Sequence, residues 1–326
     1  MHLGEERHGK YLITGSAGYI GSMLAKKIIS SRQKGTVIAR NPSRLDKTIL
    51  SGAEAIRADI ADREAILRIA GKYDYIIHCA APTKSAYMIS NPVEVAAAIV
   101  KGTDHILNLA RRSEAKSMVY LSSMEVYGQI SSPPGKRTAE NELGYLNVAD
   151  TRSCYPIAKI MAENLCHAYH AEYGVPVKIA RLAQVFGRGV RPDDKRVFAQ
   201  FANAVRTGSD IVLHTAGNSM GNYCDLDEAI EAILFLLHNG ADSEAYNVVN
   251  EKNTMRIREM AELVAKIIAG GSIKVSYDIP EGNRFGYAPD TELRLSGEKL
   301  KRLGWEAKCS LEDMYRKMLR DFEIQN

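Results

Sequence analysis

A tyrosine and a lysine four residues apart are the side chains in this sequence best suited to acid–base chemistry. Tyr155 and Lys159 lie in Tyr-Pro-Ile-Ala-Lys, in a stretch with helical spacing, so we expect them to share one helix face. An ammonium beside a phenol lowers its pKa and makes the phenolate a usable base. Ser123, at the end of a predicted strand, could hold the substrate oxygen. The pattern predicts that Tyr155 removes a hydroxyl proton while a hydride leaves the same carbon.

A glycine turn near the N-terminus indicates a dinucleotide beside these residues. Residues 14–21, Thr-Gly-Ser-Ala-Gly-Tyr-Ile-Gly, join an apolar run to a helical pattern. Glycines here permit a tight turn, a close approach of phosphates and close helix packing, and the helix start offers free N–H groups to a pyrophosphate. A tight turn that binds nothing is the simpler alternative. The predicted contacts are Gly15, Ser16, Gly18, Tyr19, Ile20 and Gly21.

Arg40 occupies the position where an acid usually meets the adenosine ribose. A guanidinium suits a 2′-phosphate, which favours NADP over NAD, although Arg40 could also be a solvated loop charge. Small residues after the strand at 75–78 would let the cofactor pass close to the sheet edge. The remaining predicted cofactor contacts are Asn41, Arg44, Asp59, Ile60, Ala80, Ala81, Pro82 and Lys159, with Thr83 assigned to the substrate.

Alternating strands and helices must position these groups. We predict strands at 11–14, 36–39, 75–78, 117–123, 177–181 and 211–214, and helices at 19–30, 64–70, 93–111, 153–173, 197–206, 227–238, 255–269 and 311–322. This order predicts an α/β fold: a doubly wound parallel Rossmann sheet with a smaller C-terminal α/β substrate lobe. We place the dinucleotide-binding domain at 1–183 and 222–248, and the substrate-binding lobe at 184–221 and 249–326.

The composition of the chain indicates which kinds of molecule it is expected to bind. Lys plus Arg is 43 and Asp plus Glu is 39, an excess of +4 that does not favour nucleic acid. The five cysteines show no C-x-x-C spacing, so we expect reduced thiols and no metal site. The polar first ten residues and the short apolar runs predict neither a secretory signal nor a membrane span. We therefore expect a cytoplasmic protein.

Motifs along almost the whole chain resemble one family. TGSAGYIG, HCAAP, LSSMEVYG, YPIAK, RLAQVFG and NYCDLDEAI are similar to segments of the extended short-chain dehydrogenase/reductases, in the NAD(P)-dependent epimerase/dehydratase group acting on nucleotide sugars. Within this group the chain most resembles UDP-glucuronate decarboxylases, in the segments at 152–159, 178–187 and 194–198.

The resemblance implies roles for individual residues. It makes Ser123 the catalytic hydroxyl, Tyr155 the base and Lys159 its partner, and it puts Glu125 at an auxiliary carboxylate position. Arg196 matches a residue that usually meets the nucleotide diphosphate. Gln184 stands where many relatives place an Asn beside the sugar. The same resemblance implies a homodimer through the helices at 93–111 and 153–173, which could instead simply cover the sheet.

Three positions depart from the family pattern. Met124, assigned to the substrate site, replaces an Asp or Ser, and a thioether cannot protonate the leaving hydroxyl of a 4,6-dehydratase reaction. Gly221 stands where relatives usually carry an Arg for the diphosphate. Arg40 replaces the acid typical of NAD-retaining sugar epimerases. These departures leave the exact reaction open.

Three functions are compatible with the sequence. The first is a nucleotide-sugar epimerase or decarboxylase that works through a transient 4-keto sugar. The second is an NADPH-dependent reductase of a keto sugar or another small carbonyl compound, which Arg40 favours. The third is a non-catalytic cofactor-sensing protein of the same fold, against which the intact Ser123, Tyr155 and Lys159 argue.

Overall fold

A seven-stranded sheet is the largest element of the computed structural model, which describes residues 8–130, 132–133, 135–281 and 290–324. Its strand order is β10-β6-β5-β4-β1-β2-β3. The neighbouring pairs β1–β2, β2–β3, β1–β4 and β4–β5 are parallel, which confirms the predicted doubly wound sheet. The strands are β1 Lys10–Thr14, β2 Lys34–Ala39, β3 Ala53–Arg57, β4 Tyr75–His78, β5 Ser117–Ser123, β6 Val177–Leu182 and β10 Ala245–Val248.

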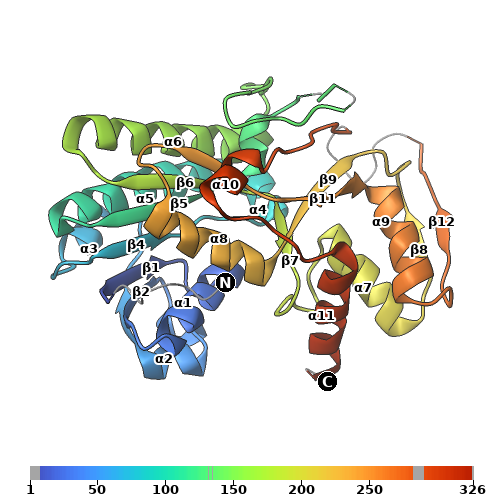
Figure 1. Cartoon of the computed structure of the whole chain (residues 1–326), viewed down its shortest axis with the longest axis horizontal. Helices are drawn as coiled ribbons and strands as arrows, with labels where there is room; N and C mark the ends of the chain where they lie inside the picture. The colour runs from blue at the N-terminus through green and yellow to red at the C-terminus, as the bar shows by residue number, and fades with distance from the viewer. Residues whose placement is uncertain (1–7, 131, 134, 282–289, 325–326) are drawn as a thin grey trace. The chain divides into compact units, whose positions relative to one another are not determined.

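Helices cover both faces of this sheet (Figure 1). α3, α5 and α6 lie on one face and α1 and α2 on the other. The helical segments before residue 240 are α1 Tyr19–Ser30, η1 Pro42–Arg44, α2 Lys47–Gly52, α3 Arg63–Leu67, α4 Ser85–Ser90, α5 Pro92–Ser113, η2 Met124–Tyr127, η3 Thr151–Ser153, α6 Cys154–Tyr173, α7 Val197–Thr207 and α8 Leu226–Asn239.

Apolar spacing explains why the elements around the site form. β1 and β4 are short apolar strands that are buried on both faces, as central strands of a parallel sheet are. In α5, the residues that face the sheet recur at helical spacing, with Val95, Ile99 and Ile106 buried. Together with Ala158 and Ala162 of α6 they join one core cluster beneath the sheet. This core fixes the positions of the strand ends that carry the site.

Contacts divide the chain into two compact units. The first comprises Met1–Gly128, Leu146–Arg181 and Ile230–Tyr246, and the second comprises Gln129–Tyr145, Leu182–Ala229 and Asn247–Asn326. Segment 129–145 groups with the second unit, whereas the sequence analysis placed it in the dinucleotide-binding domain. The assignment of cofactor to one unit and substrate to the other stays a prediction.

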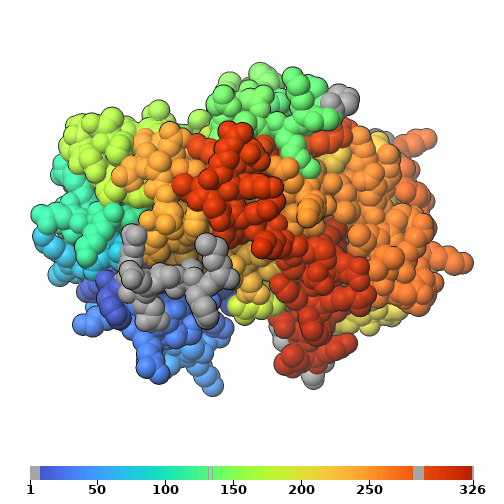
Figure 2. Space-filling view, in the orientation of Figure 1, coloured from blue at the N-terminus to red at the C-terminus, as the bar shows by residue number. Residues whose placement is uncertain are grey.

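The second unit contains two small sheets and several helices. β11-β9-β7 form a three-stranded sheet, and β8 pairs in parallel with β12. The C-terminal residues, coloured red, and the orange residues before them lie at the surface of this unit (Figure 2). Its strands and C-terminal helical segments are β7 Gln184–Phe186, β8 Ile211–Leu213, β9 Met220–Asp225, β11 Asn250–Arg256, β12 Val275–Tyr277, α9 Ile257–Leu263, the π-helical turn Val264–Ile268, α10 Glu298–Leu303 and α11 Leu311–Ile324.

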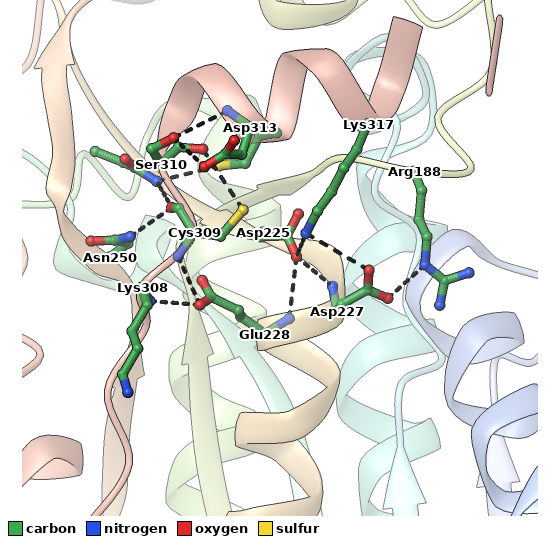
Figure 3. Close-up of polar contacts among 12 residues, drawn as sticks. Arg188, Asp225, Asp227, Glu228, Asn250, Lys308, Cys309, Ser310, Asp313 and Lys317 are labelled. Carbon is green, nitrogen blue, oxygen red and sulfur yellow. Dashed lines mark hydrogen bonds and ion pairs between the residues drawn. The ribbon is translucent and has the colours of Figure 1, made fainter. Parts of the chain in front are cut away.

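A buried carboxylate ties the last helix to the rest of the second unit (Figure 3). Lys317 of α11 reaches back to Asp225, with Nζ 3.0 Å from Oδ1 of this fully buried side chain. Burial disfavours the ammonium, but the hydrogen bond and charge of Asp225 outweigh it and raise the pKa of Lys317. Glu228 accepts the backbone N–H of Cys309 at 2.8 Å. This cluster explains why a carboxylate can be buried at the end of β9.

Several predicted elements differ from the structure. The helix predicted at 255–269 begins only at Ile257, because Met255 and Arg256 pair with β9 as the end of β11. The helix predicted at 64–70 is the shorter Arg63–Leu67, which starts where Asp62 accepts the N–H of Ala65. The strands β3, β7, β9, β10, β11 and β12 are not among the predicted ones. In the described ranges no helix has a stretch apolar and long enough to cross a bilayer.

Candidate active site

The end of β5 and the start of α6 bring the predicted catalytic residues together. Ser123 ends β5, and its Oγ accepts the N–H of Glu125, 3.2 Å away. Tyr155 and Lys159 stand on the first two turns of α6, and both are buried. The Ser123 hydroxyl lies close enough to Tyr155 to lower the pKa of its phenol, and Lys159 Nζ lies 5.8 Å from the centre of the Tyr155 ring. The predicted Ser–Tyr–Lys group is therefore compact.

The electrostatics of Tyr155 differ from the sequence prediction. Burial raises the pKa of Tyr155 above its usual range, and the charge of Glu125 raises it further, while Ser123 and Arg152 act in the opposite direction. The expected lowering of the Tyr155 pKa by Lys159 is therefore wrong. The physical reason is that the phenol is 6% exposed and the Lys159 ammonium donates to the Leu121 carbonyl, 2.7 Å away.

The residues packed around Lys159 determine its pKa. Burial lowers the pKa of Lys159 to about 8, and the nearby Glu163 opposes this effect. Its Nζ lies 4.7 Å from the centre of the Tyr120 ring, a cation–π distance. A lysine whose pKa lies near neutrality can exchange its proton during turnover, so this amine can re-protonate a neighbouring group.

A buried ion pair behind Lys159 escaped the sequence analysis. Arg181 of β6 contacts Glu163 of α6 through Nη2, 2.7 Å from Oε2, and through Nε, 3.1 Å from Oε1. Arg181 Nη1 also donates to the Tyr127 hydroxyl at 3.1 Å. The signal that could have revealed Glu163 is its spacing, one turn beyond Lys159 on the helix face that packs on the sheet.

His78 is a packed residue at the end of β4. Its Nδ1 lies 2.7 Å from Thr14 Oγ1, and its Nε2 lies 3.3 Å from Thr103 Oγ1. Burial lowers the pKa of His78 to about 3, and the charge of Lys159 adds to this effect. The imidazole is therefore neutral in the folded protein.

Acid should destabilise the protein through His78. In the unfolded chain this histidine binds a proton below about pH 6.5, whereas the buried His78 of the folded protein does not. Protonation therefore does not reduce the free energy of unfolding above that pH, and it reduces it increasingly as the pH drops toward 3. We expect this group to account for a loss of roughly 3 kcal/mol by about pH 4. Urea unfolding of wild type and His78→Gln, measured at several pH values, should give a steeper pH dependence for wild type. His167→Gln, at an exposed position, is the control, and equal slopes for wild type and His78→Gln would contradict this expectation.

The glycine turn has the shape that a dinucleotide phosphate requires. Gly15 adopts φ +73°, and a Cβ there would lie 2.8 Å from the backbone N of Ala80. A Cβ on Gly21 would lie 2.3 Å from the carbonyl oxygen of Gly15. Gly18 precedes α1 without a side-chain cap, and the first turn holds no acidic residue. The N–H groups at the start of this helix could therefore bind a pyrophosphate, and the contacts of Ser16, Tyr19 and Ile20 with it stay predictions.

Arginines gather where the adenosine end of a dinucleotide would lie. Arg40 follows β2, and Arg57 ends β3, paired in register with Ala39. Together with Arg68 they line a surface hollow of about 310 Å³, which Asp59 and Asp62 also border. No ion pair or hydrogen bond engages these three guanidinium groups within the described ranges. The sequence analysis found Arg40 but missed Arg57 and Arg68, since only the fold brings β3 and α3 beside β2.

The other predicted cofactor residues have local roles as well. Asn41 accepts the N–H of Ser43 at 3.2 Å and caps η1, which ends at the exposed Arg44. The Ile60 carbonyl accepts from His105 Nδ1 at 2.7 Å. Ala80 donates its N–H to Thr14 Oγ1 at 3.1 Å, and the half-buried Ala81 and Pro82 follow it.

The predicted substrate residues are divided between the two units. Thr83, Ser123, Met124 and Glu125 belong to the first, and Gln184 and Arg196 belong to the second. Thr83 is exposed, Met124 and Glu125 are half-buried, and Gln184 begins β7. Arg196 precedes α7 and forms an ion pair with Asp194, with Nη2 2.6 Å from Oδ2. Their contacts with a substrate stay predictions.

Gly221 has a steric reason to lack a side chain. A Cβ at this position would lie 2.2 Å from the Tyr223 hydroxyl oxygen. An arginine like that of the resembled family could not occupy this place unless Tyr223 moved.

The sequence and the fold are similar to those of several known proteins. A family model described as the NAD dependent epimerase/dehydratase family matches residues 11–249. UDP-glucuronic acid decarboxylase 5 of Arabidopsis thaliana is 28% identical over 323 residues, covering 97% of this chain and 90% of that protein. UDP-glucose 4-epimerase of Thermotoga maritima, solved with UDP-glucose, superimposes with a TM-score of 0.84 at 25% identity, over 97% of this chain and 99% of the other. A dTDP-glucose 4,6-dehydratase of Streptomyces venezuelae, solved with NAD bound, gives 0.80 at 22% identity, over 97% of each chain.

Proposed function

The chain belongs to the NAD dependent epimerase/dehydratase family, and on that basis we propose that it interconverts or decarboxylates a nucleotide sugar through a transient 4-keto sugar. The observation that carries the proposal is the compact group of Ser123, Tyr155 and Lys159 at the carboxyl end of β5, beside the glycine turn that fits a dinucleotide. Relatives whose names identify them as nucleotide-sugar enzymes match nearly the whole chain, which supports a substrate of this class.

The residues divide the proton transfers among them. A bound nicotinamide would supply the hydride acceptor, held by the glycine turn and the start of α1. Ser123 would hold the sugar hydroxyl through its Oγ. Tyr155 would take the hydroxyl proton as the carbon is oxidised and return it when the carbonyl is reduced. Lys159, with its pKa lowered to about 8, would return a proton to the phenolate.

The side chains of Glu125 and Met124 favour some of the possible reactions over others. Met124 cannot donate the proton that a departing hydroxyl needs, which disfavours sugar dehydration. Glu125 supplies a carboxylate close enough to Tyr155 to affect its pKa. This combination favours decarboxylation of a uronic acid or epimerisation at carbon 4 over loss of water.

Product analysis separates these reactions. The purified protein would be incubated with UDP-glucuronic acid, UDP-glucose or UDP-N-acetylglucosamine and catalytic amounts of NAD⁺ or NADP⁺, and the products identified by NMR. The proposal expects a pentose nucleotide with release of CO₂ from the uronic acid, or the C4 epimer of the substrate. Stoichiometric consumption of NADPH with a keto sugar would instead support a reductase, and no conversion under any condition would count against the proposal.

We also propose that the cofactor is NADP, because Arg40, Arg57 and Arg68 present three guanidinium groups at one hollow. Arginine forks suit a phosphomonoester, which NADP carries on its adenosine ribose and NAD does not. Asp59 and Asp62 partly offset this positive charge, but Asp59 accepts the N–H of Ala61 and Asp62 that of Ala65. The net positive charge of the residues that line the hollow therefore favours binding of an anion.

Removing these arginines should weaken NADP binding selectively. By calorimetry we expect Arg40→Ala and Arg57→Ala each to raise the Kd of NADP⁺ about 10-fold, the loss of one charge-assisted hydrogen bond, and to leave the Kd of NAD⁺ within about twofold. Arg63→Ala, at an exposed arginine of α3 that does not line the hollow, is the matched control. Equal losses for both nucleotides, or tighter binding of NAD⁺ by wild type, would contradict the NADP assignment.

A further inference from the structure

An arginine that no motif assigned lies against the auxiliary carboxylate of the site. The Nη2 of the Arg152 guanidinium lies 3.1 Å from Oε2 and 3.4 Å from Oε1 of Glu125. The two side chains are 31% and 39% exposed, so solvent screens their attraction only in part. Glu125 comes from η2, after β5, and Arg152 comes from η3, before α6. The pair thus links the two segments that carry Ser123 and Tyr155.

The local backbone holds Arg152 in this place. Asp150 accepts the N–H of Arg152 at 2.9 Å and so caps the turn from which the side chain leaves. On the other side, Ser123 accepts the N–H of Glu125. Both partners of the ion pair therefore start from fixed backbone, which lowers the entropy cost of pairing two long side chains.

We propose that Arg152 is a positioning residue that holds Glu125 and cancels the effect of its negative charge at the Tyr155 hydroxyl. This inference rests on the proposed role of Tyr155 as the base. With the pair intact, the two side chains together carry no net charge beside the phenol. Without Arg152, the carboxylate alone would disfavour the phenolate.

The charges around Tyr155 support this reading. Glu125 raises the pKa of Tyr155 and Arg152 lowers it, in addition to the larger effect of burial. The other polar groups that face this position are Ser123 and Tyr120 of β5, and Cys154 and Lys159 of α6, with Asp150 next to Arg152. None of these is removed by the substitutions below, so they affect each variant alike.

A set of four proteins tests the proposal without requiring turnover. Tyr155 would be replaced by 3,5-difluorotyrosine, whose phenol titrates at lower pH, and its ¹⁹F resonance followed against pH in the full chain. The set is the otherwise unchanged chain, Arg152→Gln, Glu125→Gln and the double variant, which leave a net charge beside the phenol of zero, minus one, plus one and zero. The midpoint should rise by about 0.5 in Arg152→Gln, fall by a similar amount in Glu125→Gln, and return to within about 0.2 of the parent in the double variant.

Controls separate electrostatics from structural damage. Arg152→Lys keeps the charge and should hold the midpoint near the parent value. Arg316→Gln, which breaks an exposed ion pair with Glu312, should not move it. An unchanged midpoint in Arg152→Gln, or a double variant that differs from the parent as much as either single variant does, would overturn the proposal. A protein that converts no nucleotide sugar but shows the predicted order of midpoints would contradict only the proposed function.

Discussion

Replacing Tyr155 by phenylalanine is expected to lower kcat by about 10³-fold, because the variant loses the phenol that we propose takes the sugar hydroxyl proton. Its ring is buried, so phenylalanine should keep the packing and remove only the hydroxyl oxygen. Steady-state kinetics on the substrate identified by product analysis would measure this loss, and KM should change much less than kcat.

The fold of this variant must be checked independently. Tyr155→Phe should keep the melting temperature within a few degrees of wild type, and it should bind the dinucleotide with unchanged affinity, since the glycine turn is intact. Tyr145→Phe, at an exposed tyrosine of the second unit, is the matched control for loss of one hydroxyl. A Tyr155→Phe variant that retains more than about a tenth of wild-type kcat would exclude Tyr155 as the base.

Replacing Arg181 by methionine is expected to destabilise the protein by about 3–5 kcal/mol. The guanidinium and the Glu163 carboxylate are 7% and 6% exposed, so the substitution leaves a carboxylate buried without its partner. The pKa of Arg181 reflects the same balance: burial disfavours the charged form, but the hydrogen bond and charge of Glu163 outweigh it and raise the pKa above its usual range. Urea denaturation would measure the loss of unfolding free energy.

A double variant distinguishes the charge from the packing. Removing both charges in Glu163→Met, Arg181→Met should recover a large part of the stability lost in Arg181→Met, because no buried charge remains. Arg302→Met, which breaks an exposed ion pair with Glu298, should change the unfolding free energy by less than about 1 kcal/mol. If Arg181→Met cost no more than this surface variant, the pair would not be a buried structural element.

The central strands and long helices could be predicted because the spacing of their apolar residues indicates which positions are buried. β4 and β5 were predicted with their observed bounds, and so was α1, whose start follows from the glycine turn. The edge strand β3 was missed because its sequence, AEAIR, is half exposed and has no apolar run. β11 reads as polar, and its pairing with β9 depends on a partner about thirty residues earlier in the chain.

Those parts of the candidate site that a single local motif encodes could be predicted from the sequence. The spacing of Tyr155 and Lys159 on one helix and the glycine turn are local patterns of this kind. Arg152, Arg57 and Glu163 were missed because their significance depends on neighbours from distant segments, such as the β2–β3 register. The protonation of Tyr155 was wrongly predicted for the same reason, since sequence spacing carries no information about burial.

A nucleotide sugar deuterated at carbon 4 tests the central claim most directly. If the sugar is oxidised at carbon 4 and then reduced by the same hydride, the product should keep deuterium at that carbon, and turnover should be slower than with the protiated substrate. Mass spectrometry and NMR of the product would show this result. A product that has lost the label to water, or one formed at the same rate with either substrate while Tyr155→Phe remains active, would contradict the account.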